Sequence, residues 1–356
     1  MKKNVAFQCV VMLCALSIVA FSFAGCSGSN TTAGNTPDPA TTQTSGGTPG
    51  NAEPSAPIVI QLGHVDTEAT SINRALVRMS DNVKQKTNGN LVIEIHANSE
   101  LGDERALTEG LQLGTLGMAA ISTAPMANFV KEFSVYDAPF LYRDDQHAFN
   151  VADGEVGQYL NEKMLDQGIR VLGYLSIGYR HVFSNKPVKT IEDFKGLKIR
   201  TMENSMHLAT FQALGALPTS MAFSEVFTAL QQKTIDAAEN SPKNIVDQKF
   251  YEVAKYISKT GHFYCLKTID IAEPVWETLP DDYKTILQDA AKEAVDWQRQ
   301  VAIEENNQAE QTLKDNGCTI YDFDIEALSN AIAPVYDQFP QDLPADLLEK
   351  IRNTEG

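Results

Sequence analysis

The stretch from Asp281 to Asn316 contains neither glycine nor proline, which is unusual for so many consecutive residues. Pro280 precedes it and Gly317 follows it, as is typical of the start and the stop of a helix. An unbroken helix of this length would extend about 54 Å, more than the diameter of one ordinary lobe. Two helices with a break at 304–307, where the apolar periodicity weakens, are the alternative. The apolar positions at helical spacing are Tyr283, Ile286, Leu287, Ala290, Ala294, Trp297 and Val301.

Strands and helices alternate ahead of this stretch. Because the β-α-β-α-β order is typical of α/β folds, it predicts a parallel sheet with helices on both faces. The chain has 356 residues, more than one core normally uses, and this predicts two lobes. A second sheet is expected to hold strands at 197–200 and 235–238. The other predicted strands are 58–64, 91–96, 118–121, 169–175 and 180–184, and the predicted helices are 69–87 and 107–113.

The first 25 residues have the composition of a signal peptide. Lys2 and Lys3 form a positive start, and residues 5–23 are almost continuously apolar. Phe23-Ala24-Gly25-Cys26 resembles a lipobox, which implies cleavage after residue 25 and lipidation of the Cys26 thiol. The alternative is an uncleaved transmembrane anchor, because the apolar run is nearly long enough to span a bilayer. Both interpretations place the folded region outside the cytoplasm, in the first case lipid-anchored to the cell membrane, at the cell surface or in a periplasm.

The segment after Cys26 is predicted to be a tether. Residues 27–57 consist mostly of Gly, Ser, Thr, Asn, Pro and Ala. A segment with so few apolar side chains cannot offset its ordering entropy, so 26–57 is expected to be disordered, with a reach of roughly 30 Å.

Composition limits the possible partners. The 46 Asp and Glu residues outnumber the 29 Lys and Arg residues, for a formal net charge of −17. An acidic protein is a poor partner for nucleic acid or for an anionic membrane surface. Any site for an anion must therefore be built locally.

Motifs for catalysis, metal binding or cofactor binding are missing from the sequence. It contains no Gly-rich phosphate loop, His-Glu-x-x-His, Cys-x-x-Cys or Gly-x-Ser-x-Gly, and its six histidines are scattered. We therefore expect no cofactor, no metal and no enzymatic activity.

Residues 187–200, Pro-Val-Lys-Thr-Ile-Glu-Asp-Phe-Lys-Gly-Leu-Lys-Ile-Arg, resemble a signature of the solute-binding proteins of TRAP transporters, the DctP-like family. Similar family motifs lie along about residues 58 to 300. They are Glu-Leu-Gly-Asp-Glu-Arg at 100–105, Leu-Gln-Leu-Gly-Thr-Leu at 111–116, Ala-Asn-Phe-Val at 127–130, Met-Ala-Phe-Ser-Glu-Val-Phe-Thr-Ala-Leu-Gln at 221–231, Asp-Ala-Ala-Glu-Asn at 236–240 and Gln-Lys-Phe-Tyr-Glu-Val at 248–253.

The resemblance implies a two-lobed α/β fold, similar to periplasmic binding proteins, with a ligand cleft and a long helix spanning both lobes. Lobe I would comprise 58–177 and 266–305, and lobe II 178–265 and 306–356, with crossover strands near residues 178 and 265. The implied function is capture of a small organic acid anion for delivery to TRAP membrane permease subunits. A C4-dicarboxylate or related carboxylate is expected first, and a sugar acid such as a uronate or aldonate is the alternative. A ligand-sensing lipoprotein and a lipoprotein hydrolase are the rival classes.

Arg200 is the central predicted site residue. It ends a short predicted strand, and ligands of open α/β sheets bind outside the carboxyl ends of strands. A guanidinium fits a carboxylate with two parallel hydrogen bonds, and the resemblance implies this clamp role for Arg200. It also implies site roles for Arg180 and Asn240 and a lining position at His262. Phe223 is either a pocket wall or a core aromatic.

Further candidates come from strand ends and helix starts around the same crevice. Glu104 could accept from a ligand hydroxyl or serve only as a helix-start charge. His64 precedes Val65-Asp66, where the chain departs from the family pattern in a way that bears on the distal end of the ligand; a core or surface histidine is its alternative. The others are Ser122, Thr123, Glu203 and Asn204.

Cysteine usage leaves one question open. Cys9 and Cys14 lie in the predicted signal peptide, and Cys26 is the predicted anchor. Cys265 and Cys318 could form a disulfide outside the cytoplasm, but the sequence does not show whether they meet.

Overall fold

The structure, a computed structural model, describes residues 56–339, 343–344 and 346–355. The predicted signal peptide, Cys26 and all but the end of the predicted tether lie outside the described residues. Within the described part of the chain, no helix combines the length and the apolar character needed to cross a membrane.

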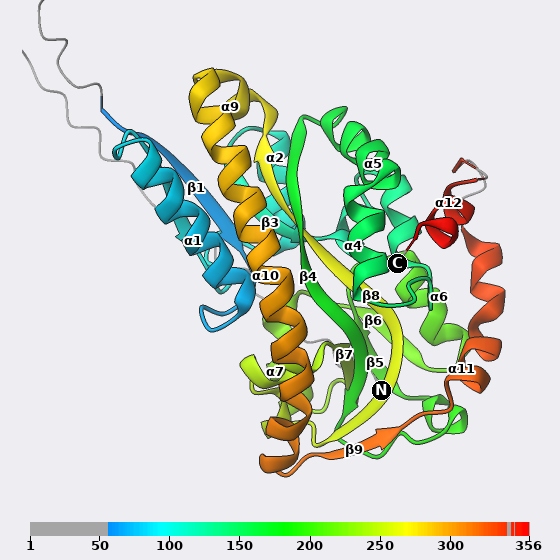
Figure 1. Cartoon of the computed structure of the whole chain (residues 1–356). Coiled ribbons are helices and arrows are strands. Elements are labelled where there is room, and N and C mark those ends of the chain that lie inside the picture. The colour runs from blue at the N-terminus through cyan, green and yellow to red at the C-terminus, as the bar shows by residue number, and fades with distance from the viewer. Residues whose placement is uncertain (1–55, 340–342, 345, 356) are drawn as a thin grey trace, which may run out of the picture. The chain divides into compact units, whose positions relative to one another are not determined.

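The predicted parallel sheet forms at one end of a larger sheet (Figure 1). Strand β1 (Ile58–His64) lies between β2 (Leu91–His96) and β3 (Met118–Ser122) and is parallel to both. The connecting helices are α1 (Ser71–Lys86) and α2 (Glu104–Gln112), so the expected alternation is confirmed. Helix α1 begins where the Thr70 side chain accepts the Asn73 N–H, and its buried apolar stripe is Ile72, Leu76, Met79 and Val83.

Two long antiparallel strands continue this sheet. They are β4 (Ile169–Ser184) and β8 (Tyr256–Ala272), and Gly178 of the first pairs with Cys265 of the second. Two separate strands were predicted where β4 is continuous. The pairing of β4 with β8 shifts register between Ser176 and Gly178 and then resumes, so the strand continues through this irregularity.

The prediction of a second sheet is wrong. Strands β7 (Ala237–Asn240), β5 (Lys198–Thr201) and β6 (Leu217–Ser220) belong to the same nine-stranded sheet, whose order is β2-β1-β3-β8-β4-β7-β5-β6. The ladder continues because β7 pairs with β4 at residues 181–184, on the edge that β8 does not use. Strand β9 (Thr319–Asp322) pairs with β8 outside this path.

The long helix is confirmed as one unbroken element, and the alternative of two helices is wrong. Helix α10 (Asp281–Asp315) has 35 residues and lies along β4 in Figure 1. Its Gln298 amide accepts from the Ser176 N–H at 2.8 Å and donates to the Ser176 carbonyl at 2.7 Å. The helix is thus attached to the backbone of β4 near its middle, besides packing on it.

The remaining helices cover the sheet and its edges. Cys265 and Cys318 are both free thiols, so no disulfide joins them. The helices are α3 (Thr123–Met126), α4 (Asp145–Asp153), α5 (Glu155–Leu165), α6 (Ser205–Ala213), α7 (Val226–Gln231), α8 (Pro242–Asp247), α9 (Glu273–Thr278), α11 (Ile325–Ile332) and α12 (Leu347–Asn353).

Candidate functional site

Two adjoining hollows open beside the carboxyl ends of β1, β3 and β5. The inner chamber has a volume of about 20 Å³ and the outer chamber about 360 Å³. Both are lined by Val65, Glu104, Arg200, Met202 and Phe223. The inner chamber is further lined by Asp66, Ser122, Ile177, Arg180, Asn240, Asn244 and Lys267.

Arg180 is held by a carboxylate within the protein. Its side chain, from β4, donates from Nε and Nη2 to the two carboxylate oxygens of Glu239 on the neighbouring β7, and from Nη2 to the Glu239 carbonyl at 2.7 Å. Burial would raise the pKa of the Glu239 carboxyl, but the charge and hydrogen bonds of Arg180, with His262 nearby, hold that pKa well below its usual range. The charge of Arg180 is therefore largely neutralised before any ligand arrives.

Arg200 differs from Arg180 in this respect. It is 4% exposed, and among the described residues no carboxylate lies within ion-pair distance of it. Its Nε and Nη2 donate to the Met221 carbonyl at 2.9 and 2.7 Å. Burial lowers the pKa of the guanidinium to about 10, an effect that the charge of Glu239 only partly offsets.

This contact limits which edge of Arg200 could form the predicted clamp. The edge formed by Nε and Nη2 is already occupied by the Met221 carbonyl. The edge formed by Nη1 and the second hydrogen of Nη2 remains to hold two carboxylate oxygens. The guanidinium carbon also lies 5.9 Å from the centre of the Phe223 ring, which forms part of the same wall.

Another part of the chamber lining carries two carboxylates and a lysine. Lys267 Nζ, 1% exposed, lies 2.5 Å from Asp66 Oδ2 and 3.3 Å from Glu104 Oε1. Glu104 also accepts the Ser122 N–H at 2.8 Å. Although burial would raise the pKa of the Asp66 carboxyl, Lys267 and His64 hold it well below its usual range. This wall therefore presents carboxylate oxygens that can accept from ligand hydroxyls.

The structure brings together most of the predicted site residues. Glu203 reaches only the outer chamber, where it forms an exposed ion pair with Arg105 at 2.8 Å. Those that line the inner chamber are Arg200, Arg180, Asn240, Phe223, Ser122 and Glu104.

Four predicted residues support the walls from behind and do not line either chamber. Thr123 donates to the Leu266 carbonyl at 3.3 Å, and His64 pairs with the Asn73 side chain at 3.1 Å. His262 lies 3.6 Å from Glu239. Asn204 caps α6 and donates to Asp137 at 3.0 Å. These contacts orient neighbours of the chamber residues.

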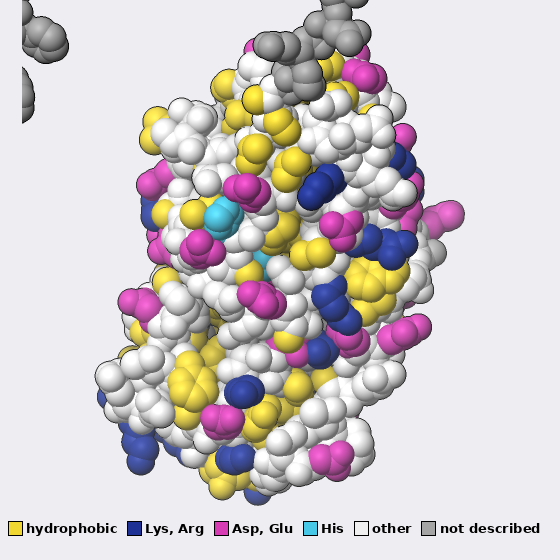
Figure 2. Space-filling model, turned by 90° about the vertical axis from the view of Figure 1, so that its left-hand side faces the viewer, with side chains coloured by type: hydrophobic (Ala, Val, Ile, Leu, Met, Phe, Trp, Pro, Cys, Tyr) yellow, Lys and Arg dark blue, Asp and Glu magenta, His cyan; other side chains and the backbone are white. Residues whose placement is uncertain are grey.

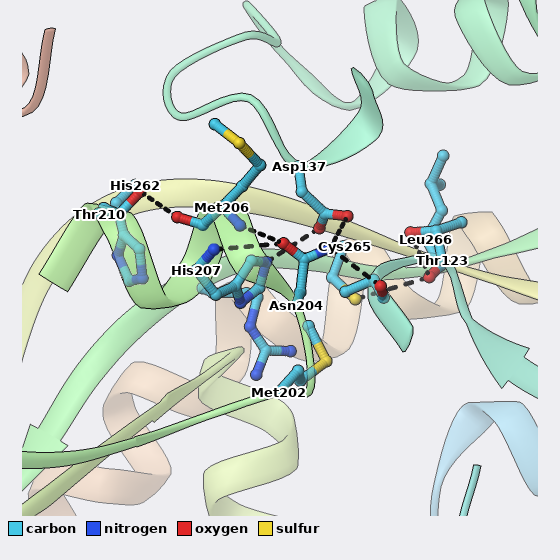
Figure 3. A network of polar contacts seen from close by, with 12 residues as sticks. Thr123, Asp137, Met202, Asn204, Met206, His207, Thr210, His262, Cys265 and Leu266 are labelled. Carbon is cyan, nitrogen blue, oxygen red and sulfur yellow. Dashed lines mark hydrogen bonds and ion pairs between the residues drawn. The ribbon is translucent and has the colours of Figure 1, made fainter. Parts of the chain in front are cut away.

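Figure 3 shows the network around Asn204 from close by. Asp137 accepts from Asn204 Nδ2 through Oδ2 and lies 2.9 Å from His207 Nε2 through Oδ1. Asn204 lies three residues after the end of β5. The network therefore fixes the turn between β5 and α6, which includes Met202, a chamber residue like Arg200. It is a rigid support for the arginine wall.

Sequence reasoning missed Asp66, Asn244 and Lys267. Asp66 comes directly after the first strand, and that position was a usable signal. Asn244 lies one helical turn after Asn240, within the short α8. Lys267 lies in the middle of β8 and reaches the chamber because it pairs with Ser122 across the sheet, which no local pattern indicates.

Figure 2 shows a face of the molecule on which charges of both signs are mixed. On the face in Figure 2, Lys and Arg side chains alternate with Asp and Glu, and no patch of one sign dominates it. Among the described residues no cluster of His, Cys, Asp or Glu is arranged to hold a metal ion.

Residues 62–342 match the family model described as bacterial extracellular solute-binding protein, family 7. The chain belongs to this family, the solute-binding proteins of TRAP transporters. This is a family of extracytoplasmic transport proteins and not an enzyme family. The resemblance seen in the sequence and the expected periplasmic-binding-protein-like α/β fold are both confirmed.

Relatives of this solute-binding protein differ in their ligands. The chain is 33% identical over 301 residues to the C4-dicarboxylate-binding periplasmic protein DctP of Rhodobacter capsulatus, covering 83% of this chain and 90% of that protein. It is 35% identical over 298 residues to the 2,3-diketo-L-gulonate-binding periplasmic protein YiaO of Escherichia coli, covering 82% and 90%. A TRAP solute-binding protein from Polaromonas, solved bound to D-erythronate, is 34% identical with a TM-score of 0.81, covering 84% of this chain and 99% of that chain.

Proposed function

We propose that this solute-binding protein captures a small organic acid anion in the inner and outer chambers and delivers it to a TRAP membrane permease. Arg200 holds the ligand carboxylate. The observation that carries the proposal is that Arg200 is a buried guanidinium without a carboxylate partner among the described residues. A buried charge is costly until an opposite charge meets it, and the ligand supplies that charge.

The chamber chemistry favours a hydroxylated monocarboxylate over a C4-dicarboxylate. From the sequence we expected the C4-dicarboxylate first and a sugar acid as the alternative. The three carboxylates of Asp66, Glu104 and Glu239 already equal in number the three cations Lys267, Arg180 and Arg200, so the lining carries no excess positive charge for a second ligand carboxylate. A second ligand carboxylate would face the wall of Asp66 and Glu104. Hydroxyl groups suit that wall, because a carboxylate accepts hydrogen bonds from them.

The relatives support this choice without deciding it. One binds D-erythronate and another is named for 2,3-diketo-L-gulonate, both of which carry one carboxylate, whereas the third is named for C4-dicarboxylates. All three ligand classes share the carboxylate that Arg200 would hold.

We further propose that ligand capture closes two lobes about the long strands. Lobe I comprises 58–177 and 266–305, and lobe II comprises 178–265 and 306–356. Ser122 and Glu104 would approach Arg200 and Asn240 on closure. Small-angle scattering should show a smaller radius of gyration at saturation, and an identical profile would argue for a rigid pocket.

Lipid anchoring through Cys26 is a separate proposal, which rests on the lipobox-like Phe23-Ala24-Gly25-Cys26. Two or more acyl chains would retain the protein at the membrane. Expression of the full chain and of Cys26→Ala tests it: the wild-type protein should fractionate with membranes and the variant should not. Equal release of both proteins would refute anchoring and leave ligand capture unaffected.

Thermal melting with a panel of acids tests the proposed function. A ligand that binds the native state raises the melting temperature by mass action. We expect saturable stabilisation by a hydroxylated acid such as erythronate, gulonate or galactonate, less by succinate or malate, and none by neutral sugars or amines. Stabilisation by a neutral sugar alone would refute the carboxylate clamp. Recovery of the bound acid unchanged would separate a binding protein from a hydrolase.

A further inference from the structure

The side-chain amide of Asn306 on helix α10 links strand β4 to helix α8, and both elements contribute residues to the inner chamber. Asn306 lies where the apolar periodicity of this helix weakens. Its Nδ2 donates to the Ile177 carbonyl at 3.1 Å, and its Oδ1 accepts the Lys243 N–H at 3.1 Å. A single side chain therefore bonds the backbone of both β4 and α8.

On the β4 side, Asn306 meets the point where the strand is irregular. The pairing with β8 shifts register between Ser176 and Gly178, and Gly178 has a φ of +96°. A Cβ added at Gly178 would lie 2.9 Å from Asn306 Nδ2, so the close approach of the amide requires glycine. Ile177 itself lines the inner chamber.

On the α8 side, Asn306 satisfies one of the N–H groups that the first turn of a helix leaves without an internal partner. The same turn carries Asn244, which lines the chamber beside Asn240 at the end of β7. Asn240 Oδ1 accepts from the Ser241 N–H at 2.8 Å and from Asn244 Nδ2 at 3.2 Å, and both asparagines line the inner chamber. Asn240 is held by the pairing of β7 with β4, so the position of α8 relative to β4 sets where the Asn244 amide lies against it.

We propose that Asn306 is a positioning residue for ligand binding, which holds the Asn240–Asn244 wall at the correct place against the irregular point of β4. It does not touch the ligand. The proposal rests on the proposed function, because it concerns the affinity of the same chamber.

The surroundings of Asn306 should tolerate its replacement by alanine, which is the substitution that tests the proposal. Lys243 Nζ on α8 lies 3.9 Å from Glu305 on α10, and this ion pair still links the two helices when the amide is removed. A cavity of about 250 Å³ already lies beside Asn306, so alanine there enlarges an existing space and does not create a sealed void.

The experiment compares Asn306→Ala with Asn307→Ala, a matched amide on the same helix that lines the same cavity and makes no side-chain hydrogen bond within the described residues. Calorimetric titration uses the acid that best stabilises the wild-type protein. We expect about tenfold weaker binding for Asn306→Ala and wild-type affinity for Asn307→Ala. Asn306→Asp, which keeps the acceptor for Lys243 but loses the donor to Ile177, should bind with intermediate affinity. It also replaces the alanine variant if that variant does not fold.

A double-mutant cycle separates positioning from a general loss of stability. Asn244→Ala should weaken binding by itself, and the combination with Asn306→Ala should weaken it by less than the product of the two single effects. A lower melting temperature of ligand-free Asn306→Ala with unchanged affinity would overturn the inference, as would fully multiplicative losses. If the wild-type protein bound no acid, the proposed function itself would fail, which is a distinguishable result.

Discussion

Arg180 and Glu239 form a buried ion pair across neighbouring strands β4 and β7, with two nitrogens of the guanidinium facing both oxygens of the carboxylate. This pair leaves the second buried arginine of the chamber, Arg200, without a carboxylate. The two arginines therefore have different roles. Arg180 belongs to a complete internal pair that shapes the wall, and Arg200 is available to an anionic ligand.

Replacing Arg200 tests its role in binding. Arg200→Lys keeps the charge but loses the planar edge, so we expect a loss of about 1.5–3 kcal/mol, or about ten- to a hundredfold in affinity. Arg200→Ala should cost about 2–5 kcal/mol, because the carboxylate is then buried without a partner. Calorimetric titration measures both values, and circular dichroism of the ligand-free variants is the control. Wild-type affinity in a folded Arg200→Ala would remove Arg200 from the site.

Replacing Glu239 tests the internal pair. Glu239→Gln removes the carboxylate and leaves the Arg180 charge buried, so we expect the free energy of unfolding to fall by about 3–5 kcal/mol. Urea denaturation measures this loss. Glu203→Gln, which removes an exposed carboxylate partner of Arg105, is the matched control and should cost at most about 1 kcal/mol. Equal effects of the two substitutions would contradict the difference in burial as the cause.

Replacing Glu104 tests ligand preference. Glu104→Gln keeps the shape of the side chain but removes one negative charge from the lining of the inner chamber. We expect affinity for a hydroxylated monocarboxylate to fall about tenfold and affinity for succinate to rise relative to it, because like-charge repulsion decreases. Competition titrations with the two acids give the ratio. An unchanged ratio would place the distal end of the ligand elsewhere.

Asp270 makes the stability of the protein depend on pH. It is fully buried on β8, accepts from Thr268 Oγ1 at 2.6 Å, and has no cation beside it among the described residues. Burial raises its pKa well above the ordinary value of 3.8. The folded state therefore holds a proton that the unfolded state releases, and stability falls as pH rises from about 4 towards the folded pKa.

Asp270→Asn tests this dependence. The amide cannot ionise, so the variant should gain stability relative to the wild-type protein as pH rises, with the smallest advantage near pH 4. Urea denaturation at a series of pH values measures the difference between the two proteins. A constant difference across that range would show that Asp270 does not titrate on unfolding.

Local sequence patterns determined the regular elements and singled out a candidate site residue. The absence of Gly and Pro predicted the helix α10, the family resemblance favoured one helix over two, and alternating apolar residues predicted β1, β2 and β3. These signals are sufficient because helix and strand periodicity depends on residues close in sequence. The position of Arg200 at the carboxyl end of a predicted strand, together with the family motif, made it the central candidate for the same reason.

Tertiary structure alone decided how the parts are joined. Whether β7 continues the sheet or starts another depends on the free edge of β4, and Lys267 reaches Asp66 and Glu104 only because β8 pairs with β3. The two arginines look alike in sequence, yet pairing across β4 and β7 gives Glu239 to Arg180 and none to Arg200. Such contacts join residues tens to hundreds of positions apart, and burial then determines which charges remain for a ligand.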